Sequence, residues 1–174
     1  AIKCYILLIY LVSPVHEKAR KLIQGRKNFF KINQPDGKRY VWFHCASLGE
    51  FEQVRPLIEK VKEEHPDSNI LLSFYSSSGY EIRKNYEFAD KVIYLPFDSY
   101  PNANMFFNTF NISLAIFVKA DLWPYYIKEI ADRKIPTYLT STTFRTGHFY
   151  FKWYGSFLRN LLQRFDGIFV QDES

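Results

Sequence analysis

The sequence predicts an α/β fold of the Rossmann-like type, a doubly wound parallel sheet with helices on both faces. Short apolar segments alternate with segments of helical periodicity along most of the chain. Within these segments the apolar residues follow one another and do not alternate with polar residues, as expected for strands of a parallel sheet that is covered on both faces. The chain has 174 residues, of which 47% are hydrophobic, so it can bury the core of one domain and is short for two.

Six strands are expected, at residues 41–46, 70–75, 92–95, 114–118, 137–140 and 168–170. The clearest helix follows the first strand, because Phe51, Val54, Ile58 and Val61 recur at spacings of three and four with charged residues between them. Further helices are expected at 79–88, 103–110, 124–133 and 151–164. A turn cluster at 33–38 separates an N-terminal arm, residues 1–40, from a Rossmann-like body, residues 41–174.

The positive charge of the chain is concentrated in this arm. Residues 1–40 contain nine Lys or Arg against two acidic residues, a net charge of +7, whereas the remainder has 14 basic and 16 acidic residues. A nucleic-acid-binding domain usually distributes basic residues over its folded surface. The sequence therefore predicts no nucleic-acid partner.

An apolar run of nine residues, 4–12, precedes most of the basic residues of the arm. A membrane-spanning helix needs about 20 apolar residues, and a signal peptide carries its charge before the apolar run. A short apolar segment followed by Lys and Arg is typical of a segment at a membrane interface, where cations meet anionic head groups. A core helix or strand is an equally good interpretation.

The cysteines and histidines predict neither a disulfide framework nor a metal site. Cys4 and Cys45 lie far apart, and the four histidines show no ligand spacing. The motifs for dinucleotides, for nucleoside triphosphates and for a serine nucleophile elbow are also absent from the sequence. These observations argue against metal-dependent, dinucleotide-dependent and serine hydrolase chemistry.

In doubly wound folds, ligands bind in the loops that follow the carboxyl ends of the strands. The first such loop leads to Glu50 in the first turn of a helix. A helix N-terminus carries unpaired N–H groups and a partial positive charge, so a carboxylate there stays ionised and oriented. An ionised and oriented carboxylate can act as a general base. The alternative is an acid that only caps the helix.

The other loops at this edge supply further candidates for ligand binding. The hydroxyls of Ser76 and Ser78 could hold a phosphate or sugar hydroxyls, or could belong to an ordinary turn. Lys119 and Asp121 flank the end of a strand, and the carboxylate of Asp121 could face Glu50 across the edge of the sheet. Arg145 could bind a phosphate or carboxylate, or could lie in water. Asp98 is expected to cap a helix.

Several of these segments resemble one enzyme family. Residues 42–50, WFHCASLGE, resemble a W-x-H-A-x-S-x-G-E motif, residues 95–98 resemble L-P-x-D, and residues 122–124 resemble the last three positions of E-[LIF]-W-P. The chain thus resembles, from about Trp42 to Glu173, the N-terminal half of the 3-deoxy-D-manno-octulosonic acid (Kdo) transferases. It departs from the family pattern at Asp121, where Glu is usual, and at Tyr125, where Asn is usual.

This resemblance implies a two-domain glycosyltransferase of the GT-B type. Its first domain would bind a lipid A precursor, and its second would bind the donor CMP-Kdo. Glu50 would be the base of an inverting reaction that needs no metal and no cofactor. The residues expected to contact the acceptor are Ser47, Gly49, Ser76, Ser78, Lys119, Asp121 and Arg145.

The resemblance also implies a place in the cell. Residues 1–40 would contact the inner membrane of a bacterium on its cytoplasmic face, where lipopolysaccharide biosynthesis begins. The donor-binding domain is expected to follow Ser174, so this chain alone is expected to be inactive. Two alternatives are another GT-B glycosyltransferase with a soluble acceptor and a non-catalytic α/β domain that docks a partner protein.

Overall fold

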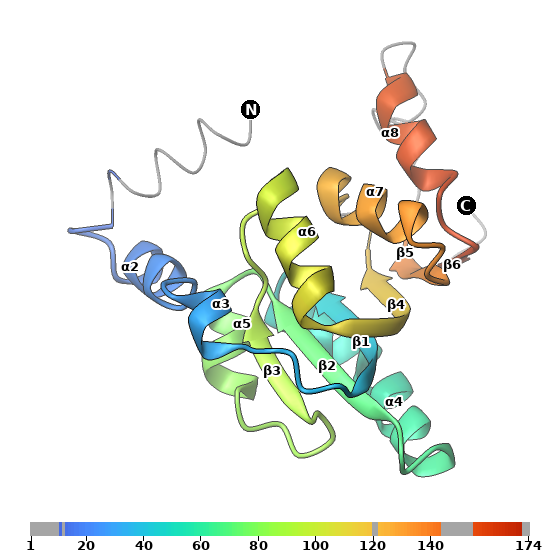
Figure 1. Ribbon diagram of the computed structural model, residues 1–174, viewed down its shortest axis with the longest axis horizontal. Coiled ribbons are helices and arrows are strands. Elements are labelled where there is room, and N and C mark those ends of the chain that lie inside the picture. Colours follow the sequence, from blue (N-terminus) through green and yellow to red (C-terminus); the bar gives the residue numbers. More distant parts are fainter. Residues whose placement is uncertain (1–10, 12, 120–121, 144–154, 172–174) are drawn as a thin grey trace.

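The computed structural model describes residues 11, 13–119, 122–143 and 155–171, which form a parallel sheet between two layers of helices (Figure 1). The sheet has the order β3-β2-β1-β4-β5-β6, and every described strand pair is parallel. The strands are β1 (Arg39–Cys45), β2 (Asn69–Phe74), β3 (Lys91–Tyr94), β4 (Asn111–Val118), β5 (Thr137–Thr142) and β6 (Gly167–Val170). The predicted fold class is confirmed, and each predicted strand corresponds to an observed one.

Helices cover both faces of this sheet. They are α2 (Glu17–Gln24), α3 (Phe29–Ile32), α4 (Leu48–Glu64), α5 (Ser77–Arg83), α6 (Tyr100–Thr109), α7 (Pro124–Asp132) and α8 (Ser156–Leu162). Helices α4 and α5 pack on one face, and α6 and α7 pack on the other. The prediction that Pro124 begins a helix is confirmed.

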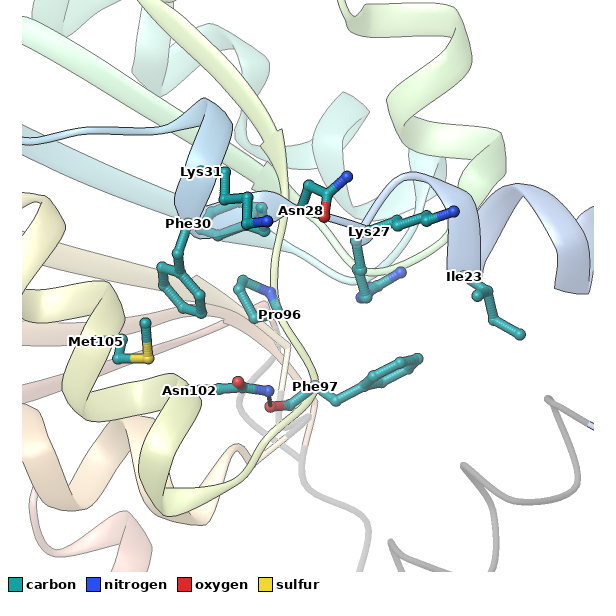
Figure 2. Close-up of a pocket in the computed structure, with 11 residues that line it drawn as sticks. Ile23, Lys27, Asn28, Phe30, Lys31, Pro96, Phe97, Asn102 and Met105 are labelled. Carbon is teal, nitrogen blue, oxygen red and sulfur yellow. Dashed lines mark hydrogen bonds between the residues drawn. The ribbon is translucent and has the colours of Figure 1, made fainter.

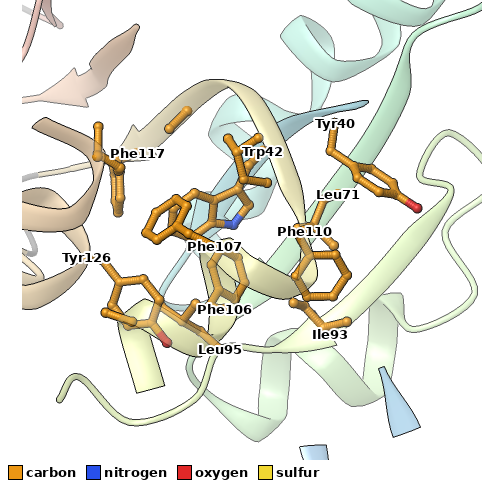
Figure 3. Close-up of a cluster of buried hydrophobic side chains, with 14 of the residues drawn as sticks. Tyr40, Trp42, Leu71, Ile93, Leu95, Phe106, Phe107, Phe110, Phe117 and Tyr126 are labelled. Atoms are coloured by element: carbon orange, nitrogen blue, oxygen red, sulfur yellow. The ribbon is translucent and has the colours of Figure 1, made fainter. Parts of the chain in front are cut away.

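Strand β1 lies at the centre of two hydrophobic cores. Trp42 faces α6 and α7, where its ring centroid lies 4.8 Å from that of Phe106 and 5.9 Å from that of Tyr126 (Figure 3). Phe43, the next residue, belongs to the opposite core with Phe51. Burial of each such side chain contributes about 1.5–3 kcal/mol. Because both faces are buried, the strand has no polar face, which explains the continuous apolar pattern.

Two predicted helices differ from the observed ones in their bounds. The helix expected at 79–88 is α5, which ends at Arg83 because the chain then turns and packs the ring of Tyr86 edge-on against Phe51, with centroids 4.9 Å apart. The helix expected at 103–110 is α6, which begins at Tyr100 because the Ser99 hydroxyl accepts a hydrogen bond from Asn102 N. Part of the helix expected at 151–164 lies outside the described residues, and α8 is the described part.

The described part of the N-terminal arm is attached to the body. Phe29 is buried in the core beneath α6 and α7. The guanidinium of Arg26 donates hydrogen bonds to the carbonyl oxygens of Leu22, Tyr75 and Leu95. Most of the apolar run at 4–12 lies outside the described residues. Within the described part of the chain, no helix combines the length and the hydrophobicity that a membrane span requires.

Candidate functional site

The strand order creates a switch point between β1 and β4. From β1 the chain passes to α4 on one face of the sheet, and from β4 it passes to α7 on the other face. The loops after these neighbouring strands therefore diverge, and a crevice between such loops is the usual ligand site of doubly wound folds. Glu50 lies in the first turn of α4, just after the first of these loops, and Lys119 begins the second.

Glu50 is the third residue of α4 and is 6% exposed. Ser47 is the N-cap, and its hydroxyl accepts a hydrogen bond from Glu50 N at 3.4 Å. In return, Oε2 of Glu50 accepts a hydrogen bond from Ala46 N at 2.5 Å. This arrangement is similar to a capping box. Glu50 therefore does stabilise the helix start, and the same contacts hold its carboxylate at the carboxyl end of β1.

The loop after β2 is joined directly to the loop that carries Glu50. The carbonyl of Ala46 accepts a hydrogen bond from Ser76 N at 2.9 Å. Ser76 caps α5 by accepting a hydrogen bond from Gly79 N, and its hydroxyl lies 3.0 Å from that of Ser78. The structure thus brings together the candidate residues of two adjacent loops, which are Ser47, Glu50, Ser76 and Ser78.

The two glycines of these loops have different surroundings. A Cβ atom on Gly79 would lie 2.3 Å from Cδ1 of Phe74, so only glycine fits there without movement of a buried ring. A Cβ atom on Gly49 would meet only the Ser47 hydroxyl, at 4.0 Å. Gly49 is exposed, and the backbone of the first turn of α4 is consequently open to a ligand.

Lys119 directly follows β4 and has a left-handed backbone conformation, with φ of 59°. Its N–H donates to the carbonyl of Thr140 at 2.8 Å, and its side chain is exposed. A non-glycine residue in this conformation costs roughly 1–2 kcal/mol, and such backbone strain is often found at functional sites. Asp121 and Arg145 lie outside the described residues.

Asp98 does act as a cap, of a helix that is distant in the chain. Its Oδ1 accepts hydrogen bonds from Tyr125 N at 3.1 Å and Tyr126 N at 3.4 Å, in the first turn of α7. The side chain is 4% exposed, and this burial raises the pKa of Asp98 to about 6 although the two N–H groups act to lower it. The sequence alone could not show this contact, because the partners are 27 and 28 residues away.

A second feature at this end of the molecule is a cavity of about 730 Å³, which we call the basic groove. It lies between α3, α6 and the segment that follows β3, and Figure 2 shows Phe30 and Met105 approaching one another from the two helices. The lining includes three cations and no acidic residue. The cations are Arg26, Lys27 and Lys31, and the apolar lining includes Phe30, Phe97 and Met105.

In the described ranges, no three His, Cys, Asp or Glu side chains come close enough to hold a metal ion. The predicted absence of a metal remains a prediction.

Comparison with known proteins identifies relatives of this chain. Residues 21–174 match the model of a family described as 3-deoxy-D-manno-octulosonic-acid transferase (kdotransferase). The 3-deoxy-D-manno-octulosonic acid transferase of Haemophilus influenzae is 28% identical over 155 residues, which are 87% of this chain and 35% of that protein. The enzyme of the same name from Aquifex aeolicus is 31% identical over 100 residues, 56% of this chain and 28% of that protein.

A third relative combines two activities in its name. The bifunctional glycosyltransferase/methyltransferase of Fusobacterium nucleatum is 28% identical over 133 residues, 73% of this chain and 20% of that protein. The chain thus spans about a fifth to a third of the length of these three relatives.

Proposed function

The chain belongs to the family of Kdo transferases, and from this premise we propose that it is the acceptor-binding part of an enzyme that transfers Kdo from CMP-Kdo to a lipid A precursor. The sheet order and the two layers of helices support a role as the N-terminal Rossmann-like domain of a GT-B glycosyltransferase. The donor CMP-Kdo would be bound by a second domain of the whole protein.

The observation that carries this proposal is the placement of Glu50. Its carboxylate lies at the N-terminus of α4, and one of its oxygens is fixed by Ala46 N–H. In the proposed step, Glu50 takes the proton of an acceptor hydroxyl while that oxygen attacks the anomeric carbon of Kdo. The bond from this carbon to the phosphate of CMP breaks on the opposite face, so the configuration inverts and CMP leaves. We propose no metal or other cofactor for this step.

The remaining site residues are proposed to bind the acceptor. The adjacent hydroxyls of Ser76 and Ser78 and the Ser47 hydroxyl can bond to sugar hydroxyls or to phosphate oxygens. The exposed Gly49 lets a ligand approach the helix start closely. Lys119 supplies a cation from the other side of β1, and Asp121 and Arg145 are proposed contacts on the loops after β4 and β5.

The basic groove supports the proposed contact of the N-terminal segment with a membrane. Lys27 and Lys31 can bind phosphate groups, while Phe97 and Met105 offer apolar surface beside them. A surface of this kind suits the lipid acceptor and the anionic head groups that surround it. We therefore propose that the enzyme works at the cytoplasmic face of the bacterial inner membrane, in lipopolysaccharide biosynthesis.

Replacement of Glu50 tests the proposed base. In the full-length protein, Glu50→Gln retains an oxygen that can accept from Ala46 N–H but removes the basic carboxylate. We expect the rate of Kdo transfer from CMP-Kdo to fall by about 10²–10⁴-fold, with little change in melting temperature.

Glu63→Gln is the matched control, because Glu63 lies on the same helix with an exposed side chain that contacts Lys60. This control should transfer Kdo at the normal rate. Activity of Glu50→Gln within a few fold of the unmodified enzyme would remove Glu50 from the mechanism.

A further inference from the structure

His44 is a buried polar residue of β1 that the proposed mechanism does not use. It lies six residues before Glu50 and is 2% exposed. Its Nδ1 lies 2.8 Å from the hydroxyl oxygen of Ser73 on β2. Its ring packs edge to face with Trp123, with centroids 4.9 Å apart and planes at 89°. Trp123 immediately precedes α7 and follows the loop proposed to bind the acceptor.

The hydrogen bonds around Ser73 decide which nitrogen of His44 carries the proton. The indole Nε1–H of Trp42 can only donate, and it donates to the Ser73 hydroxyl oxygen at 2.8 Å. The Ser73 hydroxyl proton then has two acceptors within reach, Nδ1 of His44 at 2.8 Å and the carbonyl of Phe43 at 3.5 Å. The shorter distance favours the histidine. Nδ1 therefore accepts, and the proton of the imidazole is on Nε2.

The surroundings of the ring keep it uncharged. Burial, with a smaller contribution from the positive charge of Arg26, lowers the pKa of His44 to about 3. Its Nε2 is buried and has no nitrogen or oxygen partner in the structure as described. The imidazole and the indole of Trp123 meet edge to face, and Nε1 of Trp123 is likewise buried without a hydrogen-bond partner in the described part of the chain. An N–H group directed at an aromatic face is a recognised weak hydrogen bond, which would satisfy the imidazole N–H at this contact.

We propose that His44 is a positioning residue, a neutral Nε2–H donor that holds Trp123 at the start of α7. The chain of contacts runs from Trp42 through Ser73 to His44 and Trp123, and it joins the centre of the sheet to the acceptor side of the site. His44 itself exchanges no proton during the reaction. The proposed effect of His44 on turnover rests on the proposed function. The tautomer of His44 can be tested whether or not that function is correct.

The tautomer can be measured directly in the full-length protein labelled with ¹⁵N-histidine. At pH 7 we expect Nδ1 of His44 to show the chemical shift of an unprotonated acceptor and Nε2 that of an N–H group, with no titration of the ring between pH 5 and 8. The His44→Gln variant identifies the signals by their loss. A proton on Nδ1, or an imidazolium at pH 7, would overturn the proposal.

Trp42→Phe tests the origin of the tautomer. Without the indole N–H, both lone pairs of the Ser73 hydroxyl are open to Nδ1–H, so donation from Nδ1–H should compete better and a second population with the proton on Nδ1 should appear. An unchanged single tautomer in this variant would show that Trp42 and Ser73 do not set it.

Kinetics separate positioning from proton transfer. His44→Gln keeps an N–H close to the place of Nε2, so kcat/KM for the acceptor should fall by no more than about threefold, whereas His44→Phe should lose about tenfold or more because Trp123 is misplaced. Both variants should keep the shape of the wild-type pH profile. His65→Gln is the matched control, because His65 is exposed at the C-terminal end of α4, and it should keep the wild-type kcat/KM.

The kinetic and spectroscopic results are independent of one another. Loss of one limb of the pH profile in His44→Gln, or full activity in His44→Phe, would overturn the positioning role. If the unmodified full-length protein transfers no Kdo, the proposed function fails while the tautomer measurement still tests the hydrogen-bond chain. If His44→Phe does not fold, the comparison of wild type with His44→Gln and Trp42→Phe carries the test.

Discussion

The loops around Glu50 and the basic groove lie at the same end of the molecule but are built in different ways. At Glu50, polar groups are bonded to one another: Ala46 donates to the carboxylate and accepts from Ser76, and Ser47 caps α4. In the groove, Lys27 and Lys31 are exposed beside partly exposed aromatic rings. The first arrangement holds the proposed base in place, and the second leaves charge and apolar surface exposed.

Under the proposed function, this difference would let one edge of the sheet combine chemistry and attachment. A base needs a fixed position, which short hydrogen bonds in a low-dielectric interior provide. A lipid surface is fluid and is bound by many weak contacts, for which exposed cations and rings suffice. The two regions meet at Arg26, whose guanidinium bonds to Tyr75 and Leu95 and lies 4.8 Å from the ring centroid of Phe97.

Replacement of Arg26 should have the largest effect on stability, because this residue joins the two regions. Arg26→Met leaves the carbonyls of Leu22, Tyr75 and Leu95 without this donor. We expect a loss of about 2–4 kcal/mol in the free energy of unfolding, measured by chemical denaturation. Lys27→Met, at the exposed neighbouring position, should change it by less than about 0.5 kcal/mol. Equal effects of the two variants would show that Arg26 does not anchor the groove.

The buried cap Asp98 should give the molecule a pH-dependent stability. Its pKa is about 6 in the folded protein and 3.8 is the ordinary value, so protonation favours the folded state. The stabilisation that comes from protonated Asp98 is complete below about pH 4 and is lost as the pH rises through 6. The total is on the order of 3 kcal/mol.

Asp98→Asn keeps an oxygen for Tyr125 N and Tyr126 N but cannot ionise. Relative to the wild type, its free energy of unfolding should therefore increase between pH 4 and pH 6 and stay constant from pH 7 to 8. Parallel stability curves for the two proteins over pH 4–6 would contradict the raised pKa.

The two glycines near Glu50 test how tightly its surroundings are packed. Gly79→Ala places a methyl group against the ring of Phe74 and should destabilise the protein by about 1–3 kcal/mol. The methyl group added by Gly49→Ala would point into open space on a helix. This variant should leave the stability of the protein unchanged or increase it by up to about 1 kcal/mol. If the acceptor passes over Gly49, this second variant should nevertheless raise KM for the acceptor. Similar stabilities of the two variants would contradict the packing difference.

Single changes of charge in the basic groove should have the smallest effects. Lys27→Gln and Lys31→Gln should each weaken binding of the full-length protein to anionic phospholipid vesicles by about fivefold, since one basic residue at such a surface contributes about 1 kcal/mol. Lys134→Gln, on the loop between α7 and β5, is the control and should bind normally. Unchanged vesicle binding in both groove variants would favour a soluble acceptor over a lipid.

The sequence predicted the fold class, the six strands and the loop that presents Glu50 to the carboxyl edge of the sheet. These features depend on local patterns, because continuous apolar runs mark buried parallel strands and spacings of three and four mark a helix face. The Ser47 and Glu50 pair is also local, since a cap and its partner are three residues apart. The catalytic role of Glu50 stays a prediction.

Other features depend on residues that are distant in the chain and meet only in the fold. The carboxylate of Asp98 reaches the start of α7, Arg26 binds carbonyls up to 69 residues away, and Ser73 lies 29 residues from the histidine whose tautomer it sets. Hydrogen bonding and burial at such positions follow from which strands become neighbours, and no local pattern encodes that order. The sequence by itself therefore determined the elements and the position of the candidate base, whereas the tertiary structure decided what holds the loops around it.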